Sequence, residues 1–483
     1  MANHLNELTP KALWRNFESL TNIPRPSKSE AKAVQFAVDF AKTHGLACKT
    51  DEVGNVVISK PATKGNENKP TVVLQAHLDM VPQKNTATVH DFEKDPIQAY
   101  VDGDWVKAKG TTLGADNGIG VAAALAVLES TDIPHGPVEV LLTIDEETGM
   151  TGAFNLKGDM LKGRILINLD SEEEGELCIG CAGGMNTSAI FTFTPETVPA
   201  GSKAFKVNLT GLKGGHSGVD IHLGRGNANK MMNRFLWKTS RELGLRIAKI
   251  EGGNLRNAIP RESFVSVVIP SANEKAFMAY ADEFKKMINY ELSLVEPDIA
   301  FEVTADSLPL SLIEKAVQDR LLNTVYAIPN GVIRMISDLP EVVETSTNLA
   351  IIKSEETKIE IKCLLRSSVD SAKYDLGNAM TSVFELAGAT VTHEGSYPGW
   401  KPNNESAILK AMKKGYHDKF GKTPVVNVIH AGLECGIIGD ACKGMDMISF
   451  GPTIKHPHSP DEKVNVPSVQ KFWDYLVETL KSV

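Results

Sequence analysis

Cysteine is scarce in this chain, which has six of them among 483 residues, at scattered positions. Such sparse cysteines are typical of a protein kept in a reducing compartment and argue against a disulfide-rich fold. Only Cys178 and Cys181 have the C-x-x-C spacing of redox or zinc sites, and the sequence contains no second pair of that kind. We interpret these two residues as buried thiols near the end of a strand.

The sequence also lacks the long apolar segments of membrane and secreted proteins. Its most apolar run, Ile119 to Leu128, is far shorter than the roughly 20 residues that a membrane-spanning helix needs. The N-terminal stretch MANHLNELTPKALWRNF has no basic segment followed by an apolar core, so it does not predict a signal peptide. We therefore expect a cytoplasmic protein with no membrane partner.

An excess of basic residues is missing as well. Lysine and arginine number 51 against 60 aspartates and glutamates, and the resulting net charge of −9 argues against a nucleic-acid partner. Hydrophobic residues make up 42% and charged residues 23% of the chain, which is the balance of an ordinary globular protein. A chain of 483 residues is too long for a single core, so we expect two or three domains.

One apolar stretch, Thr71 to Val81 (TVVLQAHLDMV), predicts a short buried strand that ends in His77-x-Asp79. Alternation along an extended chain places these two side chains on the same face. A neutral imidazole is a good metal ligand, and a neighbouring carboxylate can fix its tautomer and raise its basicity. Two polar residues at a strand end are more often a solvated turn, so this motif needs support from other strands.

Two further apolar strands also end in acidic residues. Val138 to Ile144 leads into the acidic run 145–147, and Ile165 to Leu169 leads into Asp170. Helix-like segments between the strands predict a mostly parallel sheet, in which ligands gather outside the carboxyl ends of the strands. Histidine and carboxylate ligands together suit Zn²⁺, Co²⁺ or Mn²⁺, and the surplus of carboxylates suits a two-metal site with one bridging carboxylate.

A glycine-rich loop, residues 110–118 (GTTLGADNG), precedes the expected helix Ile119 to Glu129. Glycine there lets the backbone approach a ligand closely, and a helix N-terminus favours an anion. The loop alone does not establish a site, because Asp116 or Asn117 could equally serve as an ordinary helix N-cap. Both interpretations stay open on these residues.

The order of the predicted elements changes after about residue 185. Strand, helix, two strands, helix and strand follow one another between residues 203 and 303, which is the ferredoxin-like order. The pattern partly recurs from residue 311 to 393, so we predict a pseudo-repeat. Its expected elements are a helix, three strands near 331–336, 345–353 and 358–366, a second helix and a last strand. We expect an α/β catalytic domain built from residues 1–185 and 396–483, with residues 186–395 inserted as an α+β lid or dimerisation domain.

Eight motifs in this order resemble the aminoacyl-histidine dipeptidases (Xaa-His dipeptidases, peptidase D). These form a carnosinase-like branch of the co-catalytic di-zinc peptidases, which include peptidase V, peptidase T and glutamate carboxypeptidase. The motifs are AHLDMVP, TTLGADNGIG, EE-x-GM, NLDSEEEGE, GLKGGHSG, NLRNAIPRE, HAGLECG and PHSPDE. The resemblance runs from about residue 8 to the C-terminus. It implies a zinc-exopeptidase-like α/β fold, a mostly parallel sheet flanked by helices, with an inserted α+β lid of doubled ferredoxin-like type.

The resemblance also implies a set of metal ligands. One zinc ion would be bound by His77 and Asp170, the other by Glu147 and His458, and Asp116 would bridge the two. The cofactor would thus be two Zn²⁺ ions per subunit, for which Co²⁺ or Mn²⁺ can substitute. A cis peptide bond is expected directly after the bridging carboxylate.

The remaining site residues are implied in the same way. Asp79 would hold the ring of the histidine that follows the first strand, and Glu146 would act as general base and acid. His216, in the GGHSG part of the lid, would stabilise the tetrahedral oxyanion. Asn257 and Arg366 would contact the substrate backbone and its C-terminal carboxylate, although an arginine at a strand end is more often part of a surface ion pair.

The implied activity is hydrolysis of unblocked dipeptides, including Xaa-His substrates such as carnosine, by a metal-bridged water with Glu146 as its general base. We expect small peptides as substrates and a homodimer as the quaternary state. One alternative is a tripeptidase or an N-acyl amino acid deacylase with the same site. Another is a non-catalytic binding protein on the same fold, which would usually lack a ligand or the base, whereas every inferred position is filled here.

Overall fold

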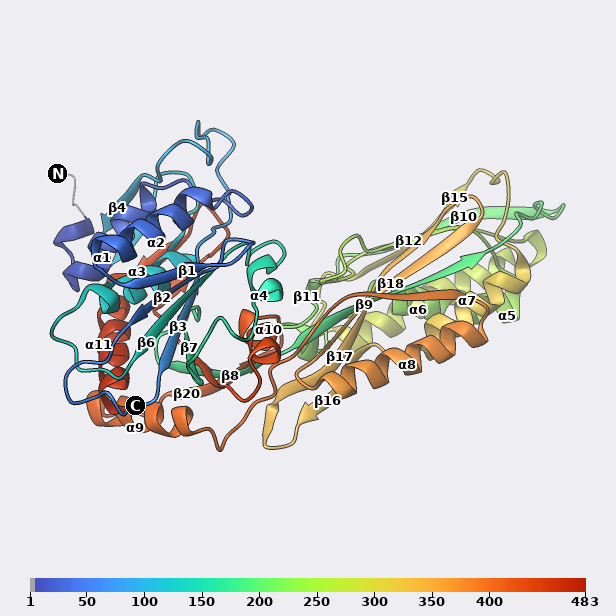
Figure 1. Cartoon of the computed structure of the whole chain (residues 1–483). Coiled ribbons are helices and arrows are strands. Elements are labelled where there is room, and N and C mark those ends of the chain that lie inside the picture. Colours follow the sequence, from blue (N-terminus) through green and yellow to red (C-terminus); the bar gives the residue numbers. More distant parts are fainter. Residues whose placement is uncertain (1–4) are drawn as a thin grey trace. The chain divides into compact units, whose positions relative to one another are not determined.

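The computed structural model describes residues 5–483, which form two compact units. The terminal unit consists of the chain up to Cys181 together with Trp400–Val428 and Leu433–Val483. The inserted unit consists of Ala182–Gly399 and Ile429–Gly432. Figure 1 labels the helices and strands of both units. Segments from the two ends of the chain therefore build the same unit.

The terminal unit is built on an eight-stranded sheet. At its centre β3 (Val72–His77) pairs in parallel with β6 (Val138–Thr143) and β7 (Ile165–Asn168), and β21 (Asp446–Ser449) pairs in parallel with β7. Further strands extend the sheet on both sides of these central strands. Among them, β2 is antiparallel to β6, and β8 is antiparallel to β21. These outer strands are β1 (Ala47–Thr50), β2 (Val56–Lys60), β8 (Glu176–Cys181) and β20 (Val425–Ile429). The predicted parallel arrangement therefore describes the central strands, and the whole sheet is mixed.

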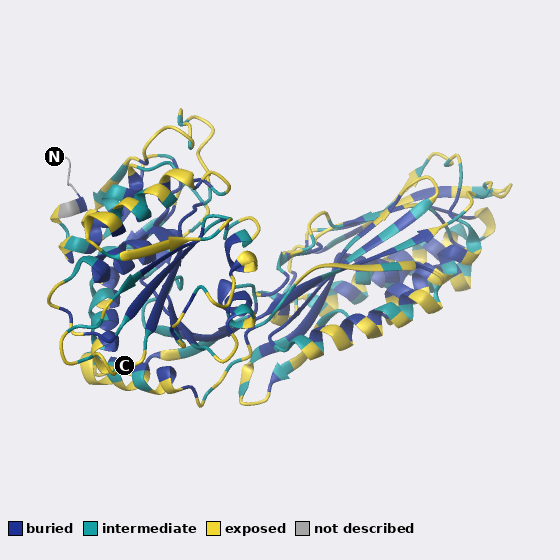
Figure 2. Ribbon diagram, in the orientation of Figure 1, coloured by how far each residue is buried: buried dark blue, intermediate teal, exposed yellow. Residues whose placement is uncertain are grey.

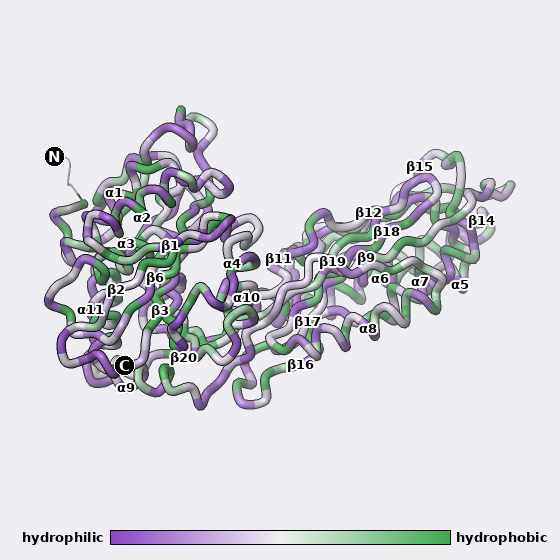
Figure 3. The backbone as a smooth tube through the Cα atoms, viewed as in Figure 1, coloured by the Kyte–Doolittle hydropathy of each residue, from purple (hydrophilic) through white to green (hydrophobic). Residues whose placement is uncertain are grey.

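The apolar runs in the sequence are the reason why these central strands form. Every residue of β3 and β6 is buried, including the polar Gln75, His77 and Glu139 that interrupt their apolar residues. Figure 3 colours the backbone of both strands by hydropathy. Strands buried on both faces are typically rich in apolar residues, as these are. The predicted thiols Cys178 and Cys181 lie in β8 and are buried, as expected.

Helices pack around the sheet of the terminal unit (Figure 1). One of them, α3 (Ala115–Glu129), is buried from Ala115 to Leu128 because its small and apolar residues leave no polar face. The others are the short 3₁₀ helix η1 (Leu5–Glu7), α1 (Lys11–Thr21), α2 (Ala31–Thr43), α4 (Thr151–Asn155), α9 (Ala407–Phe420), α10 (Glu434–Ala441) and α11 (Val466–Ser482). Within residues 5–483, no helix has the length and apolar character needed to cross a membrane.

A small four-stranded sheet brings distant parts of the terminal unit together. The predicted hairpin around Trp105 is present as β4 (Ala99–Asp102) and β5 (Trp105–Ala108). Strand β5 also pairs with β23 (Lys463–Asn465), which in turn pairs with β22 (Ile454–Lys455). The loop between β22 and β23 is therefore held beside the glycine-rich loop that follows β5.

The inserted unit contains a nine-stranded sheet with the order β15-β10-β14-β12-β17-β18-β9-β19, and β16 (Gly331–Ile336) pairs with β17 outside this path. Its first four strands have the ferredoxin-like order, since the first strand lies between the fourth and the third. The next four repeat that order in reverse, so two ferredoxin-like halves meet where β12 pairs with β17. The strands are β9 (Gly183–Thr192), β10 (Ser202–Thr210), β12 (Arg246–Gly252), β14 (Ser263–Pro270), β15 (Ala300–Asp306), β17 (Leu339–Ser354), β18 (Lys358–Ser367) and β19 (Thr390–Tyr397).

The pseudo-repeat is therefore present, but its second copy differs from the expected one. We expected the second copy to begin at residue 311 with a helix and to include a strand at 331–336. Instead its first strand is β9 (Gly183–Thr192), which precedes the first copy, and the strand at 331–336 is the outlying β16. The whole first copy is thus inserted between the first strand and the first helix of the second copy. A linear search for a repeat does not find this order, because the two copies are nested and not consecutive.

Four helices cover one face of this sheet (Figure 1). They are α5 (Ala228–Leu243), α6 (Glu274–Leu292), α7 (Lys315–Ala327) and α8 (Asp370–Leu386). Figure 2 shows their buried stripes toward the sheet and their exposed residues on the outer side. Aromatic rings fill the space between helices and strands; Phe235, for example, lies 4.9 Å from Phe301 and 5.7 Å from Phe277 between ring centroids. This packing makes the inserted unit a core of its own.

Candidate metal centre

The predicted ligands of the terminal unit meet at one edge of its sheet. His77 is the last residue of β3 and lies opposite Thr143, the last residue of β6, in the parallel pairing. The acidic run 145–147 follows β6 directly, and Asp170 follows β7 two residues after its end. Parallel strands deliver the residues after their carboxyl ends to the same side.

Two clusters of ligand atoms form there, and they share Asp116. The first contains His77, Asp116 and Asp170, and the second contains Asp116, Glu147 and His458; within each, the ligand atoms lie within 4.8 Å of one another. His77 Nε2 is 3.2 Å from Asp116 Oδ1, while His458 Nε2 is 3.2 Å from Asp116 Oδ2. The two oxygens of one carboxylate therefore face two different sites, as a bridging ligand requires.

The remaining distances complete each cluster. Asp170 Oδ1 lies 3.4 Å from His77 Nε2, and Glu147 Oε2 lies 2.9 Å from His458 Nε2. The neighbouring His456 does not join either cluster, so the choice of His458 from the PHSPDE motif agrees with the geometry.

Asp116, which lies in both clusters, is followed by an unusual local backbone. The expected cis peptide bond between Asp116 and Asn117 is present. The Asn117 side chain donates to the carbonyl of Leu169 at 2.9 Å and also to the Asp170 carboxylate. Asn117 therefore connects the start of α3 to the segment after β7.

Asp79 is fully buried and lies between the His77 ring and the backbone of the acidic run 145–147. Its Oδ1 lies 3.2 Å from His77 Nδ1, the ring nitrogen on the far side from the cluster. Its two oxygens also accept the backbone N–H groups of Glu146 and Glu147, at 3.0 and 3.2 Å. Burial by itself raises the pKa of Asp79, but His77 and these donors lower it to about 2. Asp79 thus stays ionised while it orients the His77 ring and the turn of two glutamates.

Glu146 lies beside the ligands with His77 and Glu147. Burial raises the pKa of Glu146 well above that of an exposed glutamate; the nearby carboxylates of Asp170, Glu434 and Glu147 add to this, against the opposing effect of His77. A carboxylate with a raised pKa can take up a proton near neutral pH, which a general base must do.

The chemistry of the donor set fits a pair of divalent cations. Histidine nitrogens and carboxylate oxygens are the ligands of Zn²⁺, Co²⁺ and Mn²⁺. Glu147 Oε1 is buried with no hydrogen-bond partner among residues 5–483, and a buried carboxylate oxygen without a partner is costly. Cations at the two clusters would give that oxygen a partner and neutralise the gathered negative charge.

Three buried charged residues next to this centre were not predicted from the sequence. Arg25, Glu434 and Glu462 are each at most 2% exposed. Glu434 accepts hydrogen bonds from Gln75 of β3 at 2.6 Å and from Thr143 of β6 at 2.7 Å, beneath the ligands. Two of these residues lie in motifs already quoted, HAGLECG and PHSPDE. The only signal in the sequence was that Glu434 and Glu462 are acidic residues inside these motifs without an assigned role.

The three residues predicted in the inserted unit lie close to one another. His216 is in the short strand β11 (Gly215–His216), which pairs with β13 (Ala258–Ile259). His216 pairs with Ala258, and the exposed Asn257 directly precedes Ala258 in the chain. Arg366 is buried at the end of β18, and its Nη2 lies 3.3 Å from His216 Nε2. These residues therefore form one cluster of their own unit.

The His216 ring and the Arg366 guanidinium present their donors to the same place. His216 Nδ1 accepts the backbone N–H groups of Gly218 and Val219, at 3.2 and 3.1 Å. A neutral imidazole that accepts at Nδ1 carries its proton on Nε2. Burial and the charge of Arg366 lower the pKa of His216 to about 4, so this ring is neutral at neutral pH. Two N–H groups therefore lie side by side, with 3.3 Å between their nitrogens, and an anionic oxygen beside the pair could accept from both.

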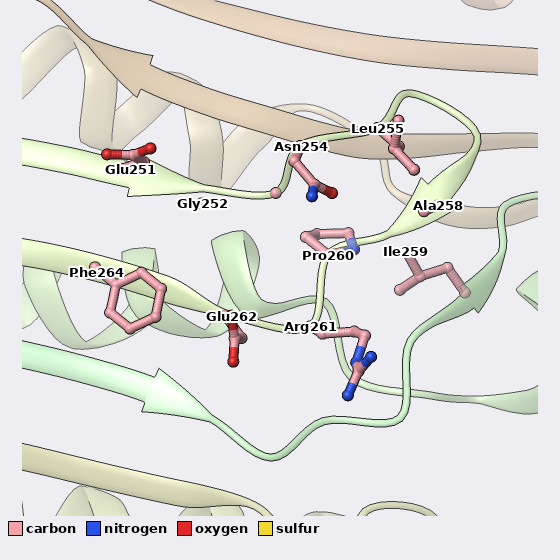
Figure 4. Close-up of a pocket in the computed structure, with 11 residues that line it drawn as sticks. Glu251, Gly252, Asn254, Leu255, Ala258, Ile259, Pro260, Arg261, Glu262 and Phe264 are labelled. Atoms are coloured by element: carbon pink, nitrogen blue, oxygen red, sulfur yellow. The ribbon is translucent and has the colours of Figure 1, made fainter. Parts of the chain in front are cut away.

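A separate pocket of about 500 Å³ lies in the inserted unit, where β12, β13 and β14 meet (Figure 4). Its lining includes Glu251, Pro260, Arg261 and Phe264. None of the predicted site residues lines it, although Asn257 belongs to the same loop. The pocket is therefore not part of the predicted site, and its lining does not indicate a second one.

Comparison with known proteins places the chain among peptidases. The model of peptidase family M20/M25/M40 matches residues 73–482. The cytosol non-specific dipeptidase of Escherichia coli is 47% identical over 481 residues, which cover 100% of this chain and 99% of that protein. The crystal structure of aminoacylhistidine dipeptidase from Vibrio alginolyticus has a TM-score of 0.95 at 50% identity, covering 99% of this chain and 98% of that one. Aminopeptidase PepT from Bacillus cereus, with a TM-score of 0.58 at 16% identity over 98% and 99% of the two chains, shares the fold.

Proposed function

This chain belongs to peptidase family M20/M25/M40, and we propose that it is a metal-dependent dipeptidase that hydrolyses unblocked dipeptides, including those with a C-terminal histidine. The relatives that are 47% and 50% identical over nearly the whole chain are both named as dipeptidases. A hydrolase acting on peptide bonds is therefore the function class. The observation that carries the proposal is the Asp116 carboxylate shared between two ligand clusters.

We assign His77 and Asp170 to one cation, Glu147 and His458 to the other, and Asp116 to both. We propose two Zn²⁺ ions per subunit, with Co²⁺ or Mn²⁺ as substitutes, because all three accept mixed histidine and carboxylate ligands. When bound, such a pair of ions makes water nucleophilic at neutral pH and polarises a carbonyl.

The protein's own groups would carry the protons. Glu146 takes a proton from the attacking water and returns it to the leaving amine, and its raised pKa suits both steps. Asp79 keeps the His77 ring in one orientation, so the first ligand cluster does not rearrange during the reaction. In the inserted unit, His216 would donate to the oxyanion, while Arg366 and Asn257 would bind the substrate carboxylate and backbone.

A panel of free and N-acetylated dipeptides tests this function most simply. With Zn²⁺-loaded protein, we expect hydrolysis of free Xaa-His and other free dipeptides. Their N-acetylated counterparts should react at least about 100-fold less efficiently in kcat/KM, because acetylation removes the charge and the donors of the amino group. Chelation of the metal should abolish both activities.

The alternatives predict different results in the same panel. An N-acyl amino acid deacylase would prefer the blocked substrates, and a tripeptidase would cleave free tripeptides faster than free dipeptides. A protein that binds all of these peptides and cleaves none would contradict the enzyme assignment. Since PHSPDE and the other ligand-bearing motifs are intact, we expect cleavage.

We also propose that the protein is a cytoplasmic homodimer in which His216 serves the metal centre of its own chain. The doubled lid carries this proposal, because a second ferredoxin-like half can take the place of a partner's lid. His216→Ala should lower kcat by about 10²–10³-fold with unchanged metal content, the usual effect of losing one oxyanion donor. Mixing His216→Ala chains with Glu146→Gln chains should restore no activity. Active mixed dimers would instead show that His216 acts across the dimer.

A further inference from the structure

We propose that Arg25 and Glu462 are positioning residues that hold the loop carrying Asp116 ready for metal binding. The inference rests on the proposed function, because it concerns the same metal centre. Neither residue belongs to a ligand cluster, so any effect on the metals must pass through Asp116 and its neighbours. Both side chains are 2% exposed and fully enclosed in the terminal unit.

Glu462 binds the backbone that leads directly to the bridging ligand. Its Oε2 accepts the N–H groups of Leu113 and Gly114, at 2.7 and 3.0 Å. Its Oε1 accepts those of Ala115 and Asp116, at 2.7 and 3.3 Å. These N–H groups lie at the start of α3, where the helix has unpaired donors and favours a negative charge. One carboxylate thereby fixes four consecutive residues, of which the last is Asp116.

Arg25 ties the same loop to the end of β3. Its Nη1 donates to the carbonyls of Leu78 and Asp79, at 2.9 and 2.8 Å, and its Nη2 donates to the carbonyl of Gly114, at 2.5 Å. The guanidinium therefore bridges the segment after His77 and the loop before Asp116. Its rigid fork of donors can hold three carbonyls at once, which a lysine ammonium on a flexible stem does less well.

Two glycines leave the room that this arrangement needs. A Cβ atom at Gly114 would lie 2.6 Å from Arg25 Nη2, and one at Gly118 would lie 2.7 Å from the same nitrogen. Gly114 also has a φ of 70°, which a side chain would disfavour. The glycines of the GADNG segment therefore admit the Arg25 side chain on either side of Asp116.

The arrangement pairs two buried charges with backbone dipoles of opposite sign, carbonyls for Arg25 and N–H groups for Glu462. Such residues could simply stabilise the fold, so the test needs a matched control. Glu139 provides one, because it is also buried and accepts two backbone N–H groups, those of Lys162 at 2.8 Å and Gly163 at 3.0 Å. It lies at the start of β6, whereas the ligands follow the end of that strand.

The experiment is a titration of metal-free protein with Co²⁺, followed by the visible absorption of the bound ion. Glu462→Gln keeps the size of the side chain but turns an N–H₂ group toward backbone donors. We expect its apparent Co²⁺ affinity to fall by about 10–100-fold, the usual cost of losing an outer-shell partner, with an altered absorption spectrum. Arg25→Lys should show the same change. In Glu139→Gln the amide oxygen can still accept both N–H groups, so this variant should leave Co²⁺ affinity and spectrum as in the wild type.

The possible failures are distinguishable. Wild-type protein that takes up no Co²⁺ would overturn the proposed function and this inference with it. Normal uptake by the wild type, with unchanged affinity and spectrum in folded Glu462→Gln and Arg25→Lys, would overturn this inference alone. If Glu462→Gln does not fold, Arg25→Lys decides the question by the same criteria. Equal losses of affinity in Glu139→Gln would likewise overturn it, since they would show a general effect on stability.

Discussion

Replacing Glu146 by glutamine should lower turnover by about 10²–10⁴-fold while both metal ions stay bound. The amide has the size of the carboxylate, so the neighbouring ligands keep their places, but it cannot accept a proton. KM should change little, because the lost function operates in the transition state. The measurements are turnover of a free Xaa-His dipeptide and zinc per chain by elemental analysis.

The adjacent residue should behave in the opposite way. Glu147→Gln replaces a charged oxygen 2.9 Å from His458 Nε2 by a weak neutral ligand, so occupancy of one zinc site should fall. If Glu146→Gln loses zinc and Glu147→Gln keeps both ions, the two roles are exchanged.

Asp145→Asn tests whether the general base has been assigned to the wrong residue of the acidic run 145–147. The carboxylate of Asp145 accepts the hydroxyl groups of Thr148 and Thr151, and its backbone N–H donates to Glu30. Its side chain is thus engaged within the turn and not in the ligand clusters that share Asp116. The two threonines donate to different oxygens of Asp145; an asparagine keeps one acceptor oxygen, and its N–H₂ group can donate to the other hydroxyl, so zinc content and turnover per folded chain should change little. Abolished turnover in Asp145→Asn alone would show that the motif is read one residue out.

Asp116→Asn should have the largest effect on the metal centre as a whole. An amide offers one neutral oxygen, so it cannot bridge two cations, and its N–H₂ group would point at one of the two ligand histidines. At least one ion should be lost. Because bound metals supply several kcal/mol of transition-state stabilisation and about 1.4 kcal/mol is tenfold in rate, turnover should fall by at least about 10³-fold.

Asp446→Asn is a suitable control for this substitution. Asp446 accepts hydrogen bonds from Ser406 and from the backbone of Ile408, at 2.6 and 3.1 Å, at the start of β21. It therefore lies at the end of its strand that is remote from the ligands, which follow the carboxyl ends of the parallel strands. This variant should keep both ions and its turnover per folded chain. Two tightly bound ions in Asp116→Asn would contradict the bridging role.

The sequence was informative about the centre because most of the proposed ligands follow the ends of strands. Apolar runs before His77, the acidic run 145–147 and Asp170 identify buried parallel strands, and parallel strands bring such residues together. His458 and Asp116 were reached only through the resemblance, since their positions depend on the pairing of β5 with β23. That pairing joins segments more than 350 residues apart in the chain, and no local pattern indicates it.

The parts that could not be predicted depend on contacts of the same long-range kind. Arg25 and Glu462 resemble ordinary charged loop residues in sequence, and only the fold shows that each is enclosed by backbone groups. Strand β9 begins with two glycines and mixes small polar residues with apolar ones, so its place between β18 and β19 does not follow from hydrophobic periodicity. It belongs there because its neighbours β18 and β19 pair with it on both sides.

The central claim is that two cations share the carboxylate of Asp116. Anomalous X-ray diffraction from crystals of the Zn²⁺-loaded protein, collected at the zinc absorption edge, tests it most directly. We predict two peaks per chain about 3.5–4 Å apart. One should lie against His77 and Asp170 and the other against Glu147 and His458, with one Asp116 oxygen on each. A single peak, or two peaks of which one does not contact Asp116, would contradict the account.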